Sequence, residues 1–194
     1  EPDYFQNSEE YIKEILRWVR EWLRLYRRFA VSLDENGRLK QIKGSIVFGS
    51  DLELSLEGQM KEEEKSFYEA EAEVLRKSLY AFQRKAGNSF KRGIGIPFEY
   101  LLRIWNLSEI ARFCILMAVS VEYDRTMGRM FSLLQDDYKE KYPTLDLCLK
   151  IYTAYEEKRF GYQAELLRQD SGFQDFLQTP LESGLSQIRI HPRI

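Results

Sequence analysis

The chain has 194 residues, a length that suits one compact domain or a compact domain with an appended helix. A hydrophobic fraction of 44% excludes bulk disorder, and a formal net charge of −2 excludes a general attraction to nucleic acid or acidic membranes. No apolar run reaches the roughly 20 residues of a membrane span, and no secretion signal opens the chain, so we expect a soluble cytoplasmic protein.

The first predicted element is an amphipathic helix over residues 8–29. Apolar residues recur there at three- and four-residue steps, which is the pattern of one buried helix face. These residues are Ile12, Ile15, Leu16, Val19, Trp22, Leu23 and Tyr26. Trp18, Leu25 and Phe29 lie beside that face, so we expect the helix to be covered on two sides.

Arginines follow the polar side of this helix. Glu14 and Glu21 lie within three or four residues of them and can neutralise part of their charge. This favours an ordinary charged face, while a docking surface for an acidic protein partner and a contact with nucleic acid or membrane stay open. The residues assigned to the candidate partner surface are Arg17, Trp18, Arg20, Trp22, Arg24, Leu25, Arg27, Arg28 and Phe29.

Four glycines punctuate residues 37–60, with short β-prone pieces at 41–48 and 52–56. This pattern predicts a small hairpin or an ordered linker, and we place a domain boundary at residue 60. A long helix follows over residues 61–90. Its expected buried stripe is Phe67, Ala70, Val74, Leu75, Leu79 and Phe82.

A series of shorter helices follows the turn at Gly93 and Gly95. Pro97 is placed to open the first of them, which runs to about residue 105. Ser108 is a good N-cap for the next, and the run 110–121 is apolar nearly all round, which predicts the central buried helix of the domain.

Two further helices are predicted at about residues 124–136 and 144–152, and a possible strand at 185–190. Cys114 and Cys148 both fall within apolar helical patterns, so we interpret them as reduced core residues. The fold class is therefore mainly α, with at most a small hairpin or wing.

The residues offer no catalytic machinery. A phosphate-binding GxxxxGK[ST] loop is absent, and His191 is the only histidine, so neither a HExxH zinc site nor a histidine-dependent triad can form. Asp136 and Asp137 are adjacent carboxylates at a predicted helix end, where a cap or solvated surface is the ordinary role. We expect no enzyme activity, no cofactor and no metal in this chain.

An ordered string of motifs occupies residues 106–152. In sequence it is Leu107-Ser108, Glu109 with Arg112, the apolar run 113–121, Asp124-Arg125, Leu134-Gln135-Asp136-Asp137 and Pro143-Thr144. This string resembles the N-terminal region of a bacterial family of AAA-type ATPases, in which a variant winged-helix domain precedes the motor. The tail LESGLSQIRIHPRI, residues 181–194, is similar to that family's exit toward the ATPase module.

The resemblance implies a fold and a role. It implies that residues 1–60 form a helix with a connector and that residues 61–194 form a winged-helix-like domain, with the Walker motifs beyond Ile194. It also implies a regulatory or partner-recruiting domain that acts by protein binding, in a parent that forms a homo-oligomeric ring. Residues 37–60 do not match the family pattern.

The predicted helices on either side of Asn106 and Leu107 have the arrangement of a helix-turn-helix. A DNA-reading version would present basic and amide side chains outward from the second helix. Here that helix carries Glu109, Arg112 and Ser120 among apolar residues, which favours protein contacts. A winged-helix nucleic-acid binder that uses the arginines of the first helix is the alternative, and an amphipathic membrane anchor is a third.

Overall fold

The computed structural model describes residues 2–33, 39–42, 62–135, 137, 139–168, 172–178 and 182–190. Within these residues the fold is mainly helical, as predicted. The elements are α1 (Ser8–Ala30), β1 (Val31–Leu33), β2 (Leu39–Ile42), α3 (Glu62–Lys91), α4 (Pro97–Ile104), α5 (Glu109–Tyr123), α6 (Arg125–Leu134), α7 (Leu145–Tyr152), α8 (Glu156–Leu166) and the 3₁₀ turn η1 (Gln174–Phe176).

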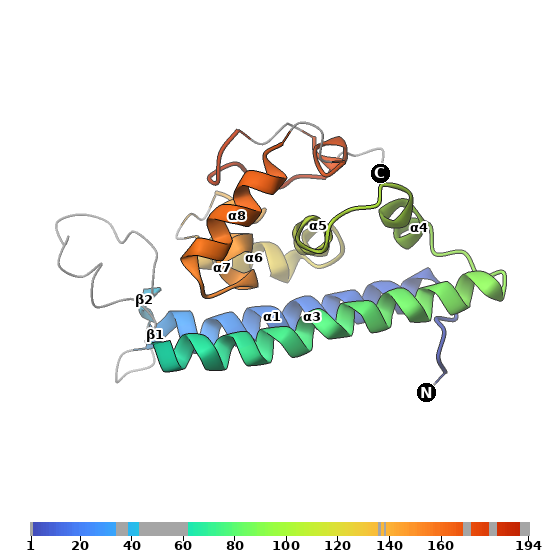
Figure 1. Cartoon of the computed structure of the whole chain (residues 1–194), viewed down its shortest axis with the longest axis horizontal. Coiled ribbons are helices and arrows are strands. Elements are labelled where there is room, and N and C mark those ends of the chain that lie inside the picture. The colour runs from blue at the N-terminus through green and yellow to red at the C-terminus, as the bar shows by residue number, and fades with distance from the viewer. Residues whose placement is uncertain are drawn as a thin grey trace.

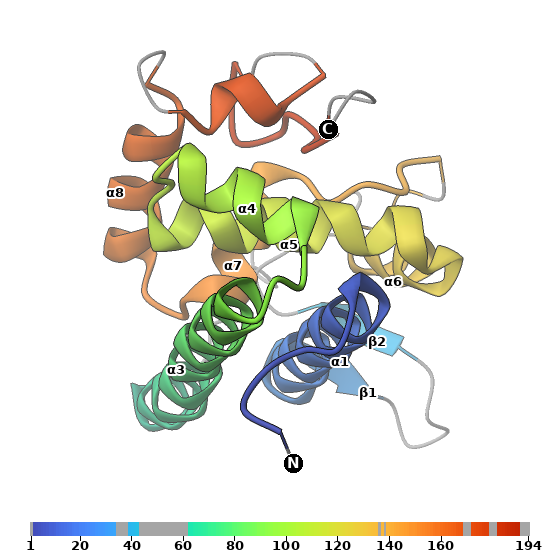
Figure 2. The same cartoon turned by 90° about the vertical axis from the view of Figure 1, so that its right-hand side faces the viewer.

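The two long helices α1 and α3 lie side by side and run in opposite directions (Figure 1). The shorter helices α4 to α8 cover one side of this pair, as both views show (Figures 1 and 2). α5 contacts α1, α6 and α7, and α7 in turn contacts α8. The molecule is therefore a layer of two long helices beneath a layer of short ones.

The interior of the molecule is built around α5. Every residue from 110 to 120 is buried, which confirms the prediction of a central buried helix. The helix begins where Ser108 accepts a hydrogen bond from the backbone N–H of Ala111, so the predicted N-cap is also confirmed. Asp124 and Thr144 cap α6 and α7 in the same way.

α1 belongs to the same hydrophobic core as α5 and α7. Trp22 lies 5.1 Å from the ring of Phe113 and 6.0 Å from that of Tyr152, measured between ring centroids. The predicted domain boundary at residue 60 lies outside the described residues and stays a prediction. The helices on either side of it share one core.

The long helix α3 confirms the predicted helix over 61–90 and part of its predicted buried stripe: Leu75 and Phe82 pack against the core, whereas Ala70 is exposed. Phe67 and Val74 are 55% and 67% exposed, whereas Tyr68 and Ala72 are fully buried. Leu79 is buried as predicted. The helix carries apolar residues on two faces, and it packs on α1. The hydroxyl of the buried Tyr68 also donates a hydrogen bond to the carbonyl oxygen of Ile151 on α7.

A two-stranded antiparallel hairpin follows α1. β1 pairs with β2 in a register that sets Val31 opposite Ile42. A small hairpin was predicted, but further along the chain: of the predicted strands, 41–48 overlaps β2 only at residues 41 and 42, and the rest of it and all of 52–56 lie outside the described residues.

The C-terminal region differs most from expectation. α8 was not predicted, and the possible strand at 185–190 is present only as two isolated bridges, from Thr144 to Gln187 and from Leu177 to Ile190. The first bridge ties the tail to the start of α7, and the second ties it to the end of η1. In the part of the chain described above, no helix combines the length and apolar character that crossing a bilayer requires.

Candidate binding surfaces

The arginines of α1 are exposed, and most of them are already paired within the chain. Arg17 binds Glu14 at 2.9 Å and Arg24 binds Glu21, both one turn away on the same helix. Arg20 reaches across to Asp124, at 2.7 Å. These pairs cancel much of the positive charge of the face.

Two arginines remain at the C-terminal end of α1. Arg28 bonds with Glu71 of α3, and its guanidinium lies 5.3 Å from the ring centroid of Phe29. Arg27 is exposed and has no ion pair within the described residues. Exposed pairs of this kind contribute only about 0–1 kcal/mol each, so a partner's carboxylates can displace them.

The apolar residues assigned to the same surface lie inside the domain. Trp18, Trp22 and Leu25 are at most 3% exposed, and Trp18 donates its indole N–H to the carbonyl oxygen of Leu75 at 2.8 Å. Phe29 is half-buried against the rings of Phe67 and Tyr68. We therefore correct the candidate surface to its arginines, because α3 and α5 already cover the tryptophans.

A short turn over residues 105–108 joins α4 to α5, at the predicted position. Asn106 holds a positive φ of 47°, a conformation that asparagine tolerates better than most residues. The polar residues in the middle of α5 do not face outward: Arg112 and Ser120 are buried, and the Ser120 hydroxyl donates to the carbonyl oxygen of Met117. This helix is not available to enter a DNA groove.

The buried charge of Arg112 is matched by Glu99 of α4. The two Oε atoms of Glu99 accept hydrogen bonds from Arg112 Nη1 at 3.1 and 2.9 Å, from Arg103 Nε at 2.9 Å and from the Tyr11 hydroxyl at 2.9 Å. Burial, reinforced by the Glu99 carboxylate, raises the pKa of Tyr11 well above its usual value, so the hydroxyl remains a donor. The unit joins α1, α4 and α5.

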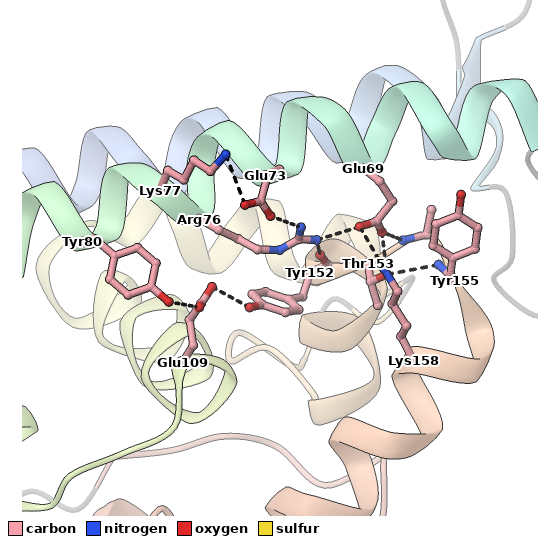
Figure 3. A network of polar contacts seen from close by, with 11 residues as sticks. Glu69, Glu73, Arg76, Lys77, Tyr80, Glu109, Tyr152, Thr153, Tyr155 and Lys158 are labelled. Carbon is pink, nitrogen blue, oxygen red and sulfur yellow. Dashed lines mark hydrogen bonds and ion pairs between the residues drawn. The ribbon is translucent and has the colours of Figure 1, made fainter.

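A second polar network joins α3 to the junction between α7 and α8 (Figure 3). Glu69 accepts hydrogen bonds from the Thr153 hydroxyl, from the backbone N–H of Ala154 at 2.8 Å and from Arg76 at 2.9 Å. Arg76 also donates to the carbonyl oxygen of Tyr152 at 2.7 Å. A cation thus meets the carboxyl end of α7 and a carboxylate lies just before α8, which suits both helix dipoles.

The same network extends to α5 through Glu109. Its carboxylate accepts hydrogen bonds from the hydroxyls of Tyr80 and Tyr152 (Figure 3). Burial and this hydrogen bond raise the pKa of Tyr152, so its hydroxyl stays protonated. Glu69 Oε1 and both oxygens of Glu109 accept hydrogen bonds from other elements, so the network holds helices together.

Sequence reasoning missed both networks. Glu99 and Arg103 are spaced four apart, which is a detectable pattern, but Arg112 and Tyr11 join them only through the tertiary fold. Asp137 lies exposed, as predicted for a solvated helix end, while Asp136 and His191 lie outside the described residues. No cluster of metal-ligating side chains occurs within the residues that the structure describes.

Comparison with known proteins assigns the class. A family model described as "Winged helix domain, variant" matches residues 2–179. Because the match spans most of the chain, from α1 to beyond η1, the chain belongs to this family. Winged helix domains commonly bind DNA or proteins and are generally non-catalytic. No curated protein and no solved structure matches the chain.

Proposed function

We propose that this chain is a non-catalytic regulatory or partner-recruiting domain at the N-terminus of a bacterial AAA-type ATPase, and that it acts in the cytoplasm by binding protein. The family match supports the domain class, and the motif string over residues 106–152 supports the parent. The observation that carries protein binding, as opposed to DNA reading, is the complete burial of residues 110–120 in α5.

The exposed arginines of α1 are the proposed contact with an acidic surface of the partner. These are Arg17, Arg20, Arg24, Arg27 and Arg28. Arg27 has no intramolecular ion pair within the described residues, and the other pairs are exposed, so exchanging Glu14 or Glu21 for a partner's carboxylate costs little. Such pairing favours fast, specific association.

The test is deletion of residues 1–194 from the full-length parent. A Walker A motif is expected in the reading frame after Ile194. We expect the shortened protein to hydrolyse ATP but to lose capture of the partner that the intact protein co-purifies. Unchanged capture would contradict the proposal, and so would ATP hydrolysis by the isolated chain.

The alternative function is a winged-helix nucleic-acid binder that uses the same arginines. It requires affinity for duplex DNA that falls steeply with salt and is lost when Arg20, Arg24 and Arg27 are replaced by Glu. The ion pairs of Arg20 and Arg24 weigh against it, because they leave few charges for phosphates. Fluorescence anisotropy with a labelled duplex separates the two functions, and liposome flotation tests a membrane anchor.

A further inference from the structure

A cleft of about 550 Å³ lies between the C-terminal half of α3 and α4. Its α3 wall consists of Tyr80, Gln83, Arg84, Gly87, Asn88 and Lys91, which recur at three- and four-residue steps along one helix face. Glu99 and Arg103 of α4 and Arg112 of α5 complete it. At 1.5 Å per residue the wall is about 16 Å long, the length of about five residues of extended chain.

The charge in this cleft is strongly positive. Four cations line it against one carboxylate, Glu99, which Arg112 and Arg103 already neutralise. Arg84 and Lys91 are exposed, and neither side chain forms a hydrogen bond or ion pair within the described parts of the chain. Asp3 and Glu109, which lie outside this lining, accept hydrogen bonds from Asn88 and Tyr80.

Arg103, the third cation of this lining, is paired with Glu99 and held in place. Its Nε binds Glu99 at 2.9 Å and its Nη2 donates to the carbonyl oxygen of Gln83. The guanidinium also lies 5.2 Å from the ring centroid of Phe90. A fixed guanidinium loses little entropy when it binds a carboxylate.

We infer that this cleft binds an extended acidic segment of a protein partner, whose carboxylates pair with Arg84, Lys91 and Arg103. Lys91 lies seven positions after Arg84, or about 10 Å along the helix axis. Charges spread over that distance match carboxylates along a peptide better than they match one compact anion. The inference rests on the proposed function only in taking the partner to be a protein, and it uses a different surface from the arginines of α1.

The test uses the whole chain and a fluorescein-labelled octaglutamate peptide, followed by anisotropy at low ionic strength. The charge-reversed pair Arg84→Glu with Lys91→Glu should bind the peptide about tenfold more weakly than wild type. The matched control is Arg125→Glu with Arg129→Glu on α6, which makes the same charge change at exposed residues outside the cleft. Circular dichroism checks that both variants fold.

Three results would overturn the inference: no binding of the peptide by wild type, equal weakening in both variant pairs, or displacement of the peptide by inorganic pyrophosphate at the peptide's own concentration. The last result would identify a phosphate site. Weaker peptide binding by the cleft variant alone, together with weaker binding at higher salt, would support the inference. The deletion of residues 1–194 from the parent tests partner capture by the whole domain. A failure of the peptide to bind this cleft would therefore leave the proposed function untouched.

Discussion

At the scale of single residues, Glu99 and Arg112 depend on each other because both are buried. Glu99 is 1% exposed and Arg112 6%. Two charges removed from water are tolerated only while each has its partner and its hydrogen bonds, and loss of one leaves the other uncompensated.

Replacing Glu99 by Gln should therefore lower the free energy of unfolding by about 3 kcal/mol, since the buried guanidinium of Arg112 keeps its charge without a counter-ion. Urea denaturation measures the change. Glu63→Gln is the control, because Glu63 is exposed on α3 and its loss should change stability by less than about 0.5 kcal/mol. Equal effects of the two substitutions would show that the pair contributes nothing.

Glu69 gives a pH dependence with a defined sign. Burial alone would raise its pKa, but hydrogen bonds from Thr153, Arg76 and Ala154 outweigh burial and hold the pKa below the usual 4.5. A carboxyl group whose pKa is lower in the folded than in the unfolded state stabilises the protein at pH values above its unfolded-state pKa. This stabilisation is lost as the pH falls through the folded-state pKa.

We therefore expect Glu69→Gln to reduce stability at neutral pH, and expect the difference from wild type to shrink as the pH falls below 4.5. Urea denaturation of both proteins over a pH series measures it. A difference that is constant with pH would mean that the carboxylate's charge plays no part.

At the scale of elements, α3 shows where periodicity stops being informative. Phe67 and Tyr68 are neighbours on a helix with two apolar faces, and the 3.6-residue pattern fits either face. The choice is made by partners distant in sequence: Phe29, Ile151 and the helix α1. By contrast α5 and its caps were predictable, because an all-apolar helix has only one environment that suits it.

Phe67 and Tyr68, which are adjacent in sequence, allow a matched experiment. Tyr68→Ala should lower the free energy of unfolding by about 3–5 kcal/mol, because it empties a fully buried site. Phe67→Ala should cost less than about 1 kcal/mol, because that ring is 55% exposed. Thermal or urea unfolding of the two variants measures both losses of stability. A larger loss for Phe67→Ala than for Tyr68→Ala would support the buried stripe that the sequence predicted.

The candidate surfaces were predictable only in part. The arginines of α1 follow from sequence spacing, but their pairing with Asp124 and Glu71 needs the tertiary fold. The cleft beside α4 combines residues from three helices, and no short-range pattern relates the residues of α3 to those of α4 and α5. α8 was missed because its few apolar residues, including the 65% exposed Phe160, form no continuous stripe.

At the scale of the whole molecule, the shared core of α1, α3, α5 and α7 makes the described elements one cooperative unit. We expect a single unfolding transition, with tryptophan fluorescence from Trp18 and Trp22 coinciding with loss of helical circular dichroism. Two separate transitions would instead support independent units divided at residue 60.

A chain of residues 61–194 alone should fail to fold, because removing α1 exposes Phe113 and Tyr152.

The two cysteines meet within that core. Cys114 and Cys148 are both fully buried, and burial beside the Cys114 thiol raises the pKa of Cys148 well above its usual value. Only an exposed thiolate reacts readily with iodoacetamide, so each alkylation must await an opening of α5 from α7. Less stable variants among those described above should be labelled faster. The labelling rate of the two thiols therefore measures how often the core opens.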